Sequence, residues 1–284
     1  MGRTENIQII NDTLALCRTN PALASAIETS IAAQTFIPEA AAFPAATPRY
    51  EAPAAVVVSK KRSFEAAAAY PGQKVAVLNF ASAVSPGGGV IKGSNAQEES
   101  LCRISTLYPC LIVPALREVF YDPHFRARDA RHNDDCIYTP GVVVFKTDST
   151  APELLPESDW YAVDVITCAA PNLRLLPGNE MNPEAGASLA GMPADVLHAL
   201  HVQRLRRILA IAAVNGADTV ILGAFGCGAF LNDPVVVADA MAQVTQEYRH
   251  MFRTIEYAVY CRPSDETNYR VFRDAMAKLE EAGA

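Results

Sequence analysis

The sequence predicts an α/β fold of three layers, with a mixed or mostly parallel sheet between two layers of helices and a helical extension before it. Two observations predict this fold. From residue 54 to residue 284, short apolar runs alternate with helical patterns, and such alternation is typical of sheets with helices on both faces. Residues 1–53 instead combine helical patterns with a segment rich in Ala and Pro. We therefore expect a helical extension with a connector over residues 1–53 and one α/β domain over residues 54–284.

The extension is expected to contain two helices and an irregular connector. Apolar residues recur at helical spacing in its first stretch, at Ile7, Ile10, Leu14 and Cys17. Asn20 and Pro21 end this helix and begin another, because Pro is favoured in the first turn of a helix. Residues 38–53 are rich in Pro and Ala, which predicts a connector draped over the surface.

The elements of the α/β domain follow in order along the chain. Apolar runs predict strands at residues 56–58, 75–78, 142–145, 161–169, 219–222 and 255–260. Amphipathic or Ala-rich patterns predict helices at residues 63–70, 95–107, 195–214, 234–248 and 264–281, with one or two further turns over 111–121. The charged segment 125–135 is expected to be a surface loop. Residues 173–193 predict a long loop of the kind that often forms a lid.

Composition excludes several classes of protein. Of the 284 residues, 50% are hydrophobic, which is enough for a substantial core. No apolar run approaches the roughly 20 residues of a membrane helix, and the first residues lack the apolar stretch of a signal peptide. The net charge is −7, and the basic clusters at 60–62 and 204–207 are short. We assign these clusters to solvated helix surfaces and expect neither membrane association nor strong binding of nucleic acid.

The cysteines and histidines predict neither a disulfide framework nor a metal site. The cysteines are scattered, odd in number and without a CxxC pair, at Cys17, Cys102, Cys110, Cys136, Cys168, Cys227 and Cys261. This pattern is typical of reduced thiols, so we expect a cytoplasmic protein. His198 and His201 have a spacing that could hold a metal, but no third ligand is evident, which favours an ordinary surface helix.

The most informative stretch of the sequence is a first glycine loop, which follows the predicted strand 75–78. Asn79 stands at the end of that strand, three glycines occupy positions 87–89, and the tripeptide QEE follows at 97–99. Consecutive glycines are usually kept for positive φ or for close approach of the backbone to a ligand. Ser94 and Gln97 have the spacing of a capping box, which predicts a helix that starts at Ser94 or Asn95. The two glutamates would then lie in its first turns, beside the glycines.

A second glycine loop, residues 223–230, lies between the predicted strand 219–222 and the helix at 234. A glycine-rich turn before a helix N-terminus can hold an anion through exposed N–H groups. Its spacing is neither GxGxxG nor a Walker A loop, and a tight turn needed only for packing is an equal alternative. Cys227 lies between two of the glycines, but no His lies near it in the sequence, so we do not assign it as a nucleophile.

The combination of GGG, seven residues and QEE resembles the signature of the microbial-type poly(ADP-ribose) glycohydrolases, which belong to the macrodomain superfamily. The flanking residues NFAS before the glycines, and ESLCR and LYP after them, are similar as well. The resemblance implies a macrodomain-like α/β/α fold, in which the second glycine loop binds the diphosphate of ADP-ribose. The alternative from the residues alone is a surface glycine loop followed by a solvated acidic helix start.

The resemblance also implies the chemistry: hydrolysis of the ribose–ribose O-glycosidic bond of poly(ADP-ribose), with release of ADP-ribose, through an oxocarbenium-like transition state. Glu99 would be the general acid and then the base, and Glu98 would hold the distal ribose. Consecutive helical residues point roughly 100° apart, so one carboxyl must perform both proton transfers. The implied substrate-binding residues are Asn79, Gly87, Gly88, Gly89, Gln97, Gly226, Cys227, Gly228, Ala229 and Phe230.

Two of these assignments have plain alternatives. Asn79 would contact the distal ribose, or it is a local turn former. Phe230 would stack near the adenine, or it is an ordinary core aromatic. The extension, residues 1–53, would favour cleavage at chain ends. The resemblance implies no cofactor, ADP-ribosylated proteins as partners and a part in the DNA damage response, and we expect a monomer.

Two other functions share the same expected pocket. One is a macrodomain that binds ADP-ribose without cleaving it, which would have no need of an acid at Glu99. The other is a hydrolase that removes single ADP-ribose groups from proteins or from a nucleic-acid base. Substrate choice depends on loops that the sequence does not specify.

Overall fold

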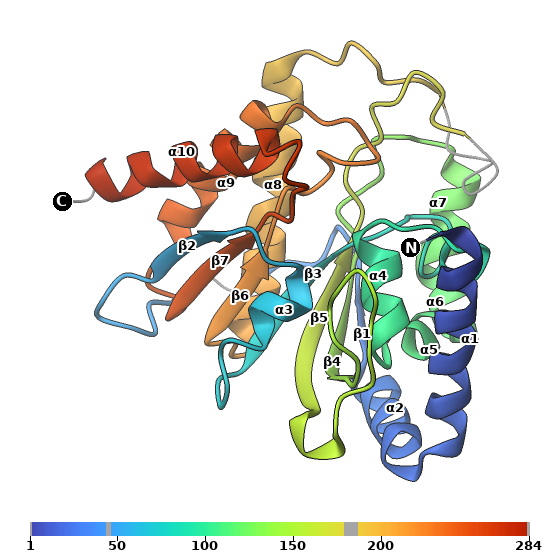
Figure 1. Cartoon of the computed structure of the whole chain (residues 1–284). Helices are drawn as coiled ribbons and strands as arrows, with labels where there is room; N and C mark the ends of the chain where they lie inside the picture. Colours follow the sequence, from blue (N-terminus) through green and yellow to red (C-terminus); the bar gives the residue numbers. More distant parts are fainter. Residues whose placement is uncertain (1, 44–46, 179–186, 283–284) are drawn as a thin grey trace.

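The computed structural model describes residues 2–43, 47–178 and 187–282. These residues form a seven-stranded sheet in the order β1-β4-β5-β3-β6-β7-β2, with helices on both faces (Figure 1). Neighbouring strands from β5 to β2 are parallel, whereas β4 runs antiparallel to β1 and β5. The prediction of a three-layer α/β fold with a mixed sheet is confirmed.

The strands range in length from three residues in β1 to nine in β4. Their bounds are β1 Thr35–Ile37, β2 Ala55–Ser59, β3 Val75–Phe80, β4 Cys136–Val144, β5 Tyr161–Cys168, β6 Thr219–Leu222 and β7 Thr254–Ala258.

The helices vary widely in length. The longer ones are α1 Arg3–Thr19, α2 Pro21–Ala33, α4 Gln97–Ile104, α8 Ala194–Val214, α9 Pro234–Tyr248 and α10 Thr267–Ala282. Shorter α-helices are α3 Ser63–Ala67, α5 Leu107–Leu111, α6 Pro114–Leu116 and α7 Asp122–Ala127. A π-helical segment spans Arg117–Tyr121, and 3-10 turns span Val90–Lys92 and Glu157–Asp159. None of the helices within the described ranges is long and apolar enough to cross a membrane.

The alternation of side chains along β3 shows how the sheet separates two cores. Ala76 and Leu78 belong to the cluster that packs under α8, α9 and α10. Val75 and Val77 belong to the cluster under α1, α3 and α4. Successive residues of a strand point to opposite faces, so one continuous apolar run serves both layers.

The extension is part of the same fold. The break at Asn20 and Pro21 is confirmed: Asn20 Oδ1 accepts the N–H groups of Ala22 and Leu23 at the start of α2. The next strand, β1, was not predicted, and it pairs with β4 at the edge of the sheet. From α1, Asn6 Nδ2 donates to the carbonyl of Gly93 at 3.1 Å, so the extension contacts the end of the first glycine loop. The division of the chain at residue 53 stays a prediction.

Several expected boundaries differ from the structure. The strand expected at 142–145 begins at Cys136, because β4 continues through Pro140 and Gly141 with a register shift between Thr139 and Val142. The expected surface loop 125–135 begins inside α7. The loop expected at 173–193 includes residues 179–186, which lie outside the described residues, so its assignment as a lid stays a prediction.

Candidate active site

A cavity of about 750 Å³ lies at the carboxyl edge of the parallel strands, the edge at which open α/β sheets usually bind ligands. Both glycine loops reach its wall, because β3 and β6 are neighbours and end at the same edge. Among the predicted residues, those on the wall are Gly88, Gly89, Gln97, Glu98, Glu99, Gly226, Gly228, Ala229 and Phe230. Asn79, Gly87 and Cys227 are not among the residues on the wall.

Gly87 and Gly88 of the first glycine loop share a backbone conformation that favours glycine, and each packs against a different neighbour. Gly87 and Gly88 have φ angles of 66° and 59°, which L side chains rarely adopt. A Cβ at Gly87 would lie 2.5 Å from the ring of Tyr108. A Cβ at Gly88 would lie 2.5 Å from Glu99 Oε1 and 3.1 Å from Glu98 Oε2. The backbone of Gly88 therefore packs directly against both carboxyl groups.

The start of α4 depends on Glu99 and not on the predicted capping box. The helix begins at Gln97, with Ala96 as its N-cap residue, so the expected start at Ser94 or Asn95 is wrong. Glu99 Oε2 accepts the N–H of Ala96 at 3.0 Å, and Oε1 accepts the N–H of Gly89 at 2.9 Å. Glu99 thus joins the helix to the glycine loop, and its side chain is 7% exposed at the cavity wall.

Gln97 is turned toward β3 and connects the helix to the sheet. Its Nε2 donates to the Leu78 carbonyl at 2.7 Å and to Ser63 Oγ at 3.0 Å, and its Oε1 accepts the N–H of Phe80 at 2.9 Å. All the polar atoms of the Gln97 amide therefore have partners within the protein. In this arrangement Gln97 fixes where α4 begins relative to the strand.

Glu98 is more deeply enclosed than Glu99, with 3% of its surface exposed. Its Oε2 accepts the N–H of Ser82 at 2.7 Å, and its Oε1 accepts from Asn79 Nδ2 at 3.2 Å. Burial, and then the negative charge of Glu99, raise the pKa of Glu98 well above its usual value, against the opposing effect of these hydrogen bonds. Glu98 therefore gives up its proton less readily than an exposed glutamate does.

Asn79 lies beneath the cavity and is fully buried. Its Nδ2 donates to Glu98 Oε1 and to Thr167 Oγ1, each at 3.2 Å. The residue is inside β3, which extends to Phe80, and not at the strand end as expected. In this structure Asn79 orients Glu98.

The second glycine loop also contributes to the wall of the cavity. Gly226 has a φ of 79°, and an added Cβ there would lie 2.8 Å from Ala170 Cβ. A Cβ at Gly228 would meet no atom within 4 Å, so this position faces open space. Cys227 Sγ donates to the Phe225 carbonyl, and burial raises the pKa of its thiol to about 12. A thiol with that pKa stays protonated at pH 7 and is a poor nucleophile.

Arg62, Tyr260 and Arg174 are among the residues on the wall that the sequence prediction missed. Arg62 follows β2, and its guanidinium lies 3.8 Å from the ring centre of Tyr260, which follows β7. Arg174, in the segment after β5, also lines the cavity. Their positions in the sequence could have identified them, because segments that follow parallel strands gather at one edge of the sheet.

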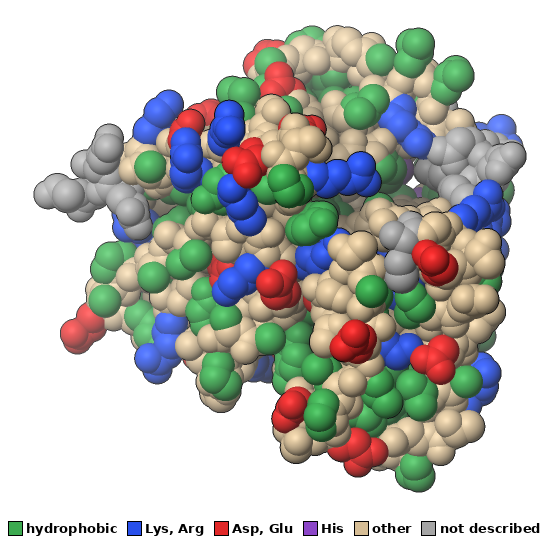
Figure 2. Space-filling view, viewed as in Figure 1, with side chains coloured by type: hydrophobic (Ala, Val, Ile, Leu, Met, Phe, Trp, Pro, Cys, Tyr) green, Lys and Arg blue, Asp and Glu red, His purple; other side chains and the backbone are tan. Residues whose placement is uncertain are grey.

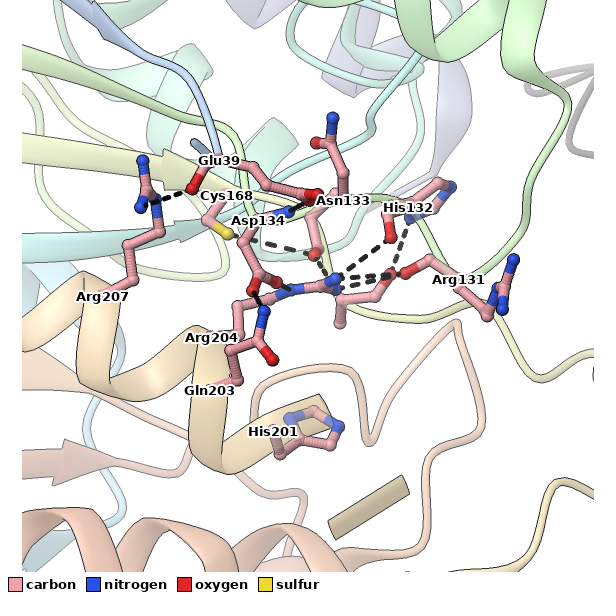
Figure 3. A network of polar contacts seen from close by, with 12 residues as sticks. Glu39, Arg131, His132, Asn133, Asp134, Cys168, His201, Gln203, Arg204 and Arg207 are labelled. Carbon is pink, nitrogen blue, oxygen red and sulfur yellow. Dashed lines mark hydrogen bonds and ion pairs between the residues drawn. The ribbon is translucent and has the colours of Figure 1, made fainter. Parts of the chain in front are cut away.

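Arg204, the first residue of the basic cluster at 204–207, is buried and does not belong to a solvated helix surface. Arg204 is 1% exposed, and its Nε donates to Asp134 Oδ1 at 2.7 Å. Its other nitrogens donate to backbone carbonyls (Figure 3), including that of Ala169 at 2.6 Å. The next residue, Ala170, is on the cavity wall. His201, one turn earlier on α8, is also fully buried, so its assignment to a surface helix is wrong.

The face in Figure 2 carries Lys and Arg side chains mixed with Asp and Glu, without a continuous basic tract. Within the described ranges, no group of three or more His, Cys, Asp or Glu is placed to hold a metal ion. The cysteines Cys17, Cys102, Cys110, Cys136, Cys168, Cys227 and Cys261 are all free thiols.

Comparison with known protein families matches residues 4–147, slightly more than half of the chain, to the family described as microbial-type PARG, catalytic domain. The chain belongs to this family. The matched segment contains the first glycine loop and both glutamates, and it ends before the second glycine loop. A comparison with curated protein sequences finds no significant match.

Solved structures of this family resemble the chain over nearly its whole length. Poly(ADP-ribose) glycohydrolase (PARG) from Thermomonospora curvata is 29% identical, with a TM-score of 0.81 over 96% of this chain and 99% of that one. The same enzyme bound to the inhibitor ADP-HPD is 28% identical, with a TM-score of 0.77 over 95% of this chain and 98% of that one. PARG from Deinococcus radiodurans in complex with ADP-ribose is 29% identical, with a TM-score of 0.72 over 89% of this chain and 97% of that one.

Proposed function

We propose that this protein is a poly(ADP-ribose) glycohydrolase that hydrolyses ribose–ribose O-glycosidic bonds and releases ADP-ribose. The observation that carries the proposal is one cavity whose walls hold both glycine loops together with Glu98 and Glu99. Its volume, about 750 Å³, lies within the range of pockets that enclose one small ligand. Membership of the microbial-type PARG family supports the same activity.

The chemical roles are assigned to two carboxyl groups with unequal surroundings. Glu99 is the proposed general acid, which protonates the leaving oxygen and then activates water, and Glu98 holds the distal ribose. The raised pKa of Glu98 favours the alternative in which Glu98 carries the proton. Glu98→Gln and Glu99→Gln, compared in one assay, decide between these roles, because only loss of the acid abolishes turnover while ADP-ribose still binds.

The remaining substrate contacts are assigned to the two loops. Gly87, Gly88 and Gly89 let the backbone approach the distal ribose closely, and the second glycine loop, residues 223–230, holds the diphosphate through its N–H groups. Phe230 stacks near the adenine, and Asn79 acts on the distal ribose through Glu98.

We propose cleavage at chain ends, because the cavity has room for about one unit of the polymer. Among residues 2–43 and 47–53 of the extension, none is on the cavity wall, and we propose that the extension affects this preference through its contact with Gly93 at the end of the first glycine loop. Polymers of defined length distinguish the two modes of cleavage. Cleavage at ends yields ADP-ribose from the first turnovers, whereas internal cleavage yields short oligomers.

The substrate class is tested by one comparison of three substrates with purified protein. Poly(ADP-ribose), a protein carrying single ADP-ribose groups and ADP-ribosylated DNA are incubated in parallel, and released ADP-ribose is measured. The proposal predicts release from the polymer at a rate far above the other two. Binding of ADP-ribose without release from any substrate would instead support the non-catalytic macrodomain.

The cellular setting is proposed on less direct grounds. Free cysteines throughout the chain favour a reducing compartment, so we infer a cytoplasmic enzyme that acts on ADP-ribosylated proteins, including those formed in the DNA damage response. We propose a monomer, which size-exclusion chromatography with light scattering tests directly.

A further inference from the structure

Asn232 lies directly behind the second glycine loop and is only 2% exposed. Its Nδ2 donates to the carbonyl oxygens of Gly226 at 3.1 Å and Phe230 at 3.2 Å. The same nitrogen donates to the carbonyl of Pro171 at 2.7 Å, in the segment that follows β5. Its backbone N–H also donates to the Gly226 carbonyl, at 3.1 Å. One side chain therefore connects both ends of the segment 226–230 to each other and to the segment that follows β5.

The other side of the same amide is held from α8. His201 Nε2 lies 2.8 Å from Asn232 Oδ1, and an amide oxygen can only accept, so Nε2 must carry the proton. His201 is fully buried, and this burial lowers its pKa to about 4, so the ring is neutral at pH 7. Figure 3 shows His201 on α8 apart from the contacts that surround Arg204. The ring therefore fixes which side of the Asn232 amide faces the loop.

The backbone beside Asn232 needs such support. Leu231 has a φ of 57°, a conformation that residues other than glycine adopt rarely and at some cost. Its side chain is 62% exposed, so packing of that side chain cannot be what holds the turn. At the other end of the segment, a Cβ at Gly226 would lie 2.9 Å from Asn232 Cγ. The loop thus closes tightly around the Asn232 amide.

We propose that Asn232, oriented by His201, is the positioning residue that holds residues 226–230 in the conformation that lines the cavity. The inference rests on the proposed function, in which this segment binds the diphosphate of ADP-ribose. Asn232 does not touch the cavity, so its effect on the ligand passes through the backbone of the loop.

The test replaces Asn232 with the isosteric Asp. Asn232→Asp places an oxygen where Nδ2 faces three carbonyl oxygens, so the side chain can no longer donate to Gly226 and Phe230 in the loop or to Pro171, with almost no change in volume. We expect the Kd for ADP-ribose and the KM for polymer to rise about tenfold or more, with a smaller change in kcat, because the diphosphate is held equally in ground and transition states. We also expect faster amide hydrogen exchange at residues 226–232.

The matched control is Asn215→Asp. Asn215 Nδ2 donates to the Ile211 carbonyl at the far end of α8. This control should change none of these values.

A second pair of variants keeps the test decisive if Asn232→Asp does not fold. His201→Gln retains a donor for Asn232 Oδ1 and should bind ADP-ribose within about threefold of the wild type, whereas His201→Leu should lose affinity about tenfold. Wild-type affinity and wild-type exchange in both Asn232→Asp and His201→Leu would overturn the inference. Failure of the wild type to bind ADP-ribose would overturn the proposed function, and hydrogen exchange, which needs no ligand, would still decide the role of Asn232.

Discussion

Gly88→Ala tests whether the first glycine loop sets the position of the catalytic carboxyl groups. The added Cβ would lie 2.5 Å from Glu99 Oε1, and an ordinary contact begins near 3.4 Å, so the carboxyl must move by about 0.9 Å. Misplacement of a reacting group by about 1 Å can reduce the rate about 100-fold. We therefore expect kcat for release of ADP-ribose from polymer to fall by about two orders of magnitude, equivalent to roughly 2.7 kcal/mol of activation free energy.

The same substitution also strains the backbone, so the control must carry that strain alone. Gly72 has a φ of 75° and would have no atom within 4 Å of an added Cβ. Both variants should therefore lose about 1–2 kcal/mol of stability through the left-handed backbone, which calorimetry measures. Only Gly88→Ala should lose turnover. A Gly88→Ala enzyme with wild-type kcat, or a Gly72→Ala enzyme that loses turnover equally, would refute this reasoning.

Three further predictions concern stability and its dependence on pH. Arg204→Met leaves the buried Asp134 without its cationic partner and should lower the free energy of unfolding by about 3–5 kcal/mol, whereas Arg206→Met, on the exposed side of the same helix, should change it by less than about 1 kcal/mol in denaturant titrations. Asn6→Ala leaves a carbonyl at the end of the first glycine loop without its hydrogen bond from α1 and should lower the free energy of unfolding by about 1–3 kcal/mol, measured in the same way. The raised pKa of Glu98 means that the contribution of Glu98 to stability falls as the pH rises above the ordinary value of 4.5. Glu98→Gln does not titrate, so its stability relative to the wild type should increase from pH 4.5 upward, by at most about 1.4 kcal/mol per pH unit until the raised pKa is reached.

Each of these predictions has a clear contrary result. Equal losses in Arg204→Met and Arg206→Met would show that burial of the ion pair does not decide its effect. Unchanged stability in Asn6→Ala would show that α1 does not support the first glycine loop through this contact. A constant difference between Glu98→Gln and the wild type across pH would show that Glu98 titrates normally.

The main features of the site could be predicted from the sequence because they depend on local patterns. A strand, a glycine segment and a helix start follow one another in both loops, and parallel strands bring such loops to one edge of a sheet. The second helix of the extension was predictable for a similar reason, since Asn20 and Pro21 are local signals. The expected start of α4 failed because Glu99, and not Gln97, makes the reciprocal contact with the N-cap backbone.

Other features depend on contacts between distant segments, which a single sequence does not reveal. β1 has three residues and exists through pairing with β4, about 100 positions later. Pro140 and Gly141 suggest a break, yet β4 accommodates them with a bulge. Arg204 and His201 look like surface residues on an amphipathic helix until Asp134 and Asn232 are placed opposite them. Arg62 and Tyr260 form a pair at the cavity only because β2 and β7 are neighbours.

The turnover of the Glu99→Gln variant tests most directly whether Glu99 is the general acid. Glu99→Gln keeps the shape of the residue and one acceptor for the N–H groups of Gly89 and Ala96, but it cannot transfer a proton. The account predicts calorimetric binding of ADP-ribose within about threefold of the wild type and a rate of release from polymer lower by about 100-fold to 10,000-fold. Turnover near the wild-type rate in Glu99→Gln would contradict it.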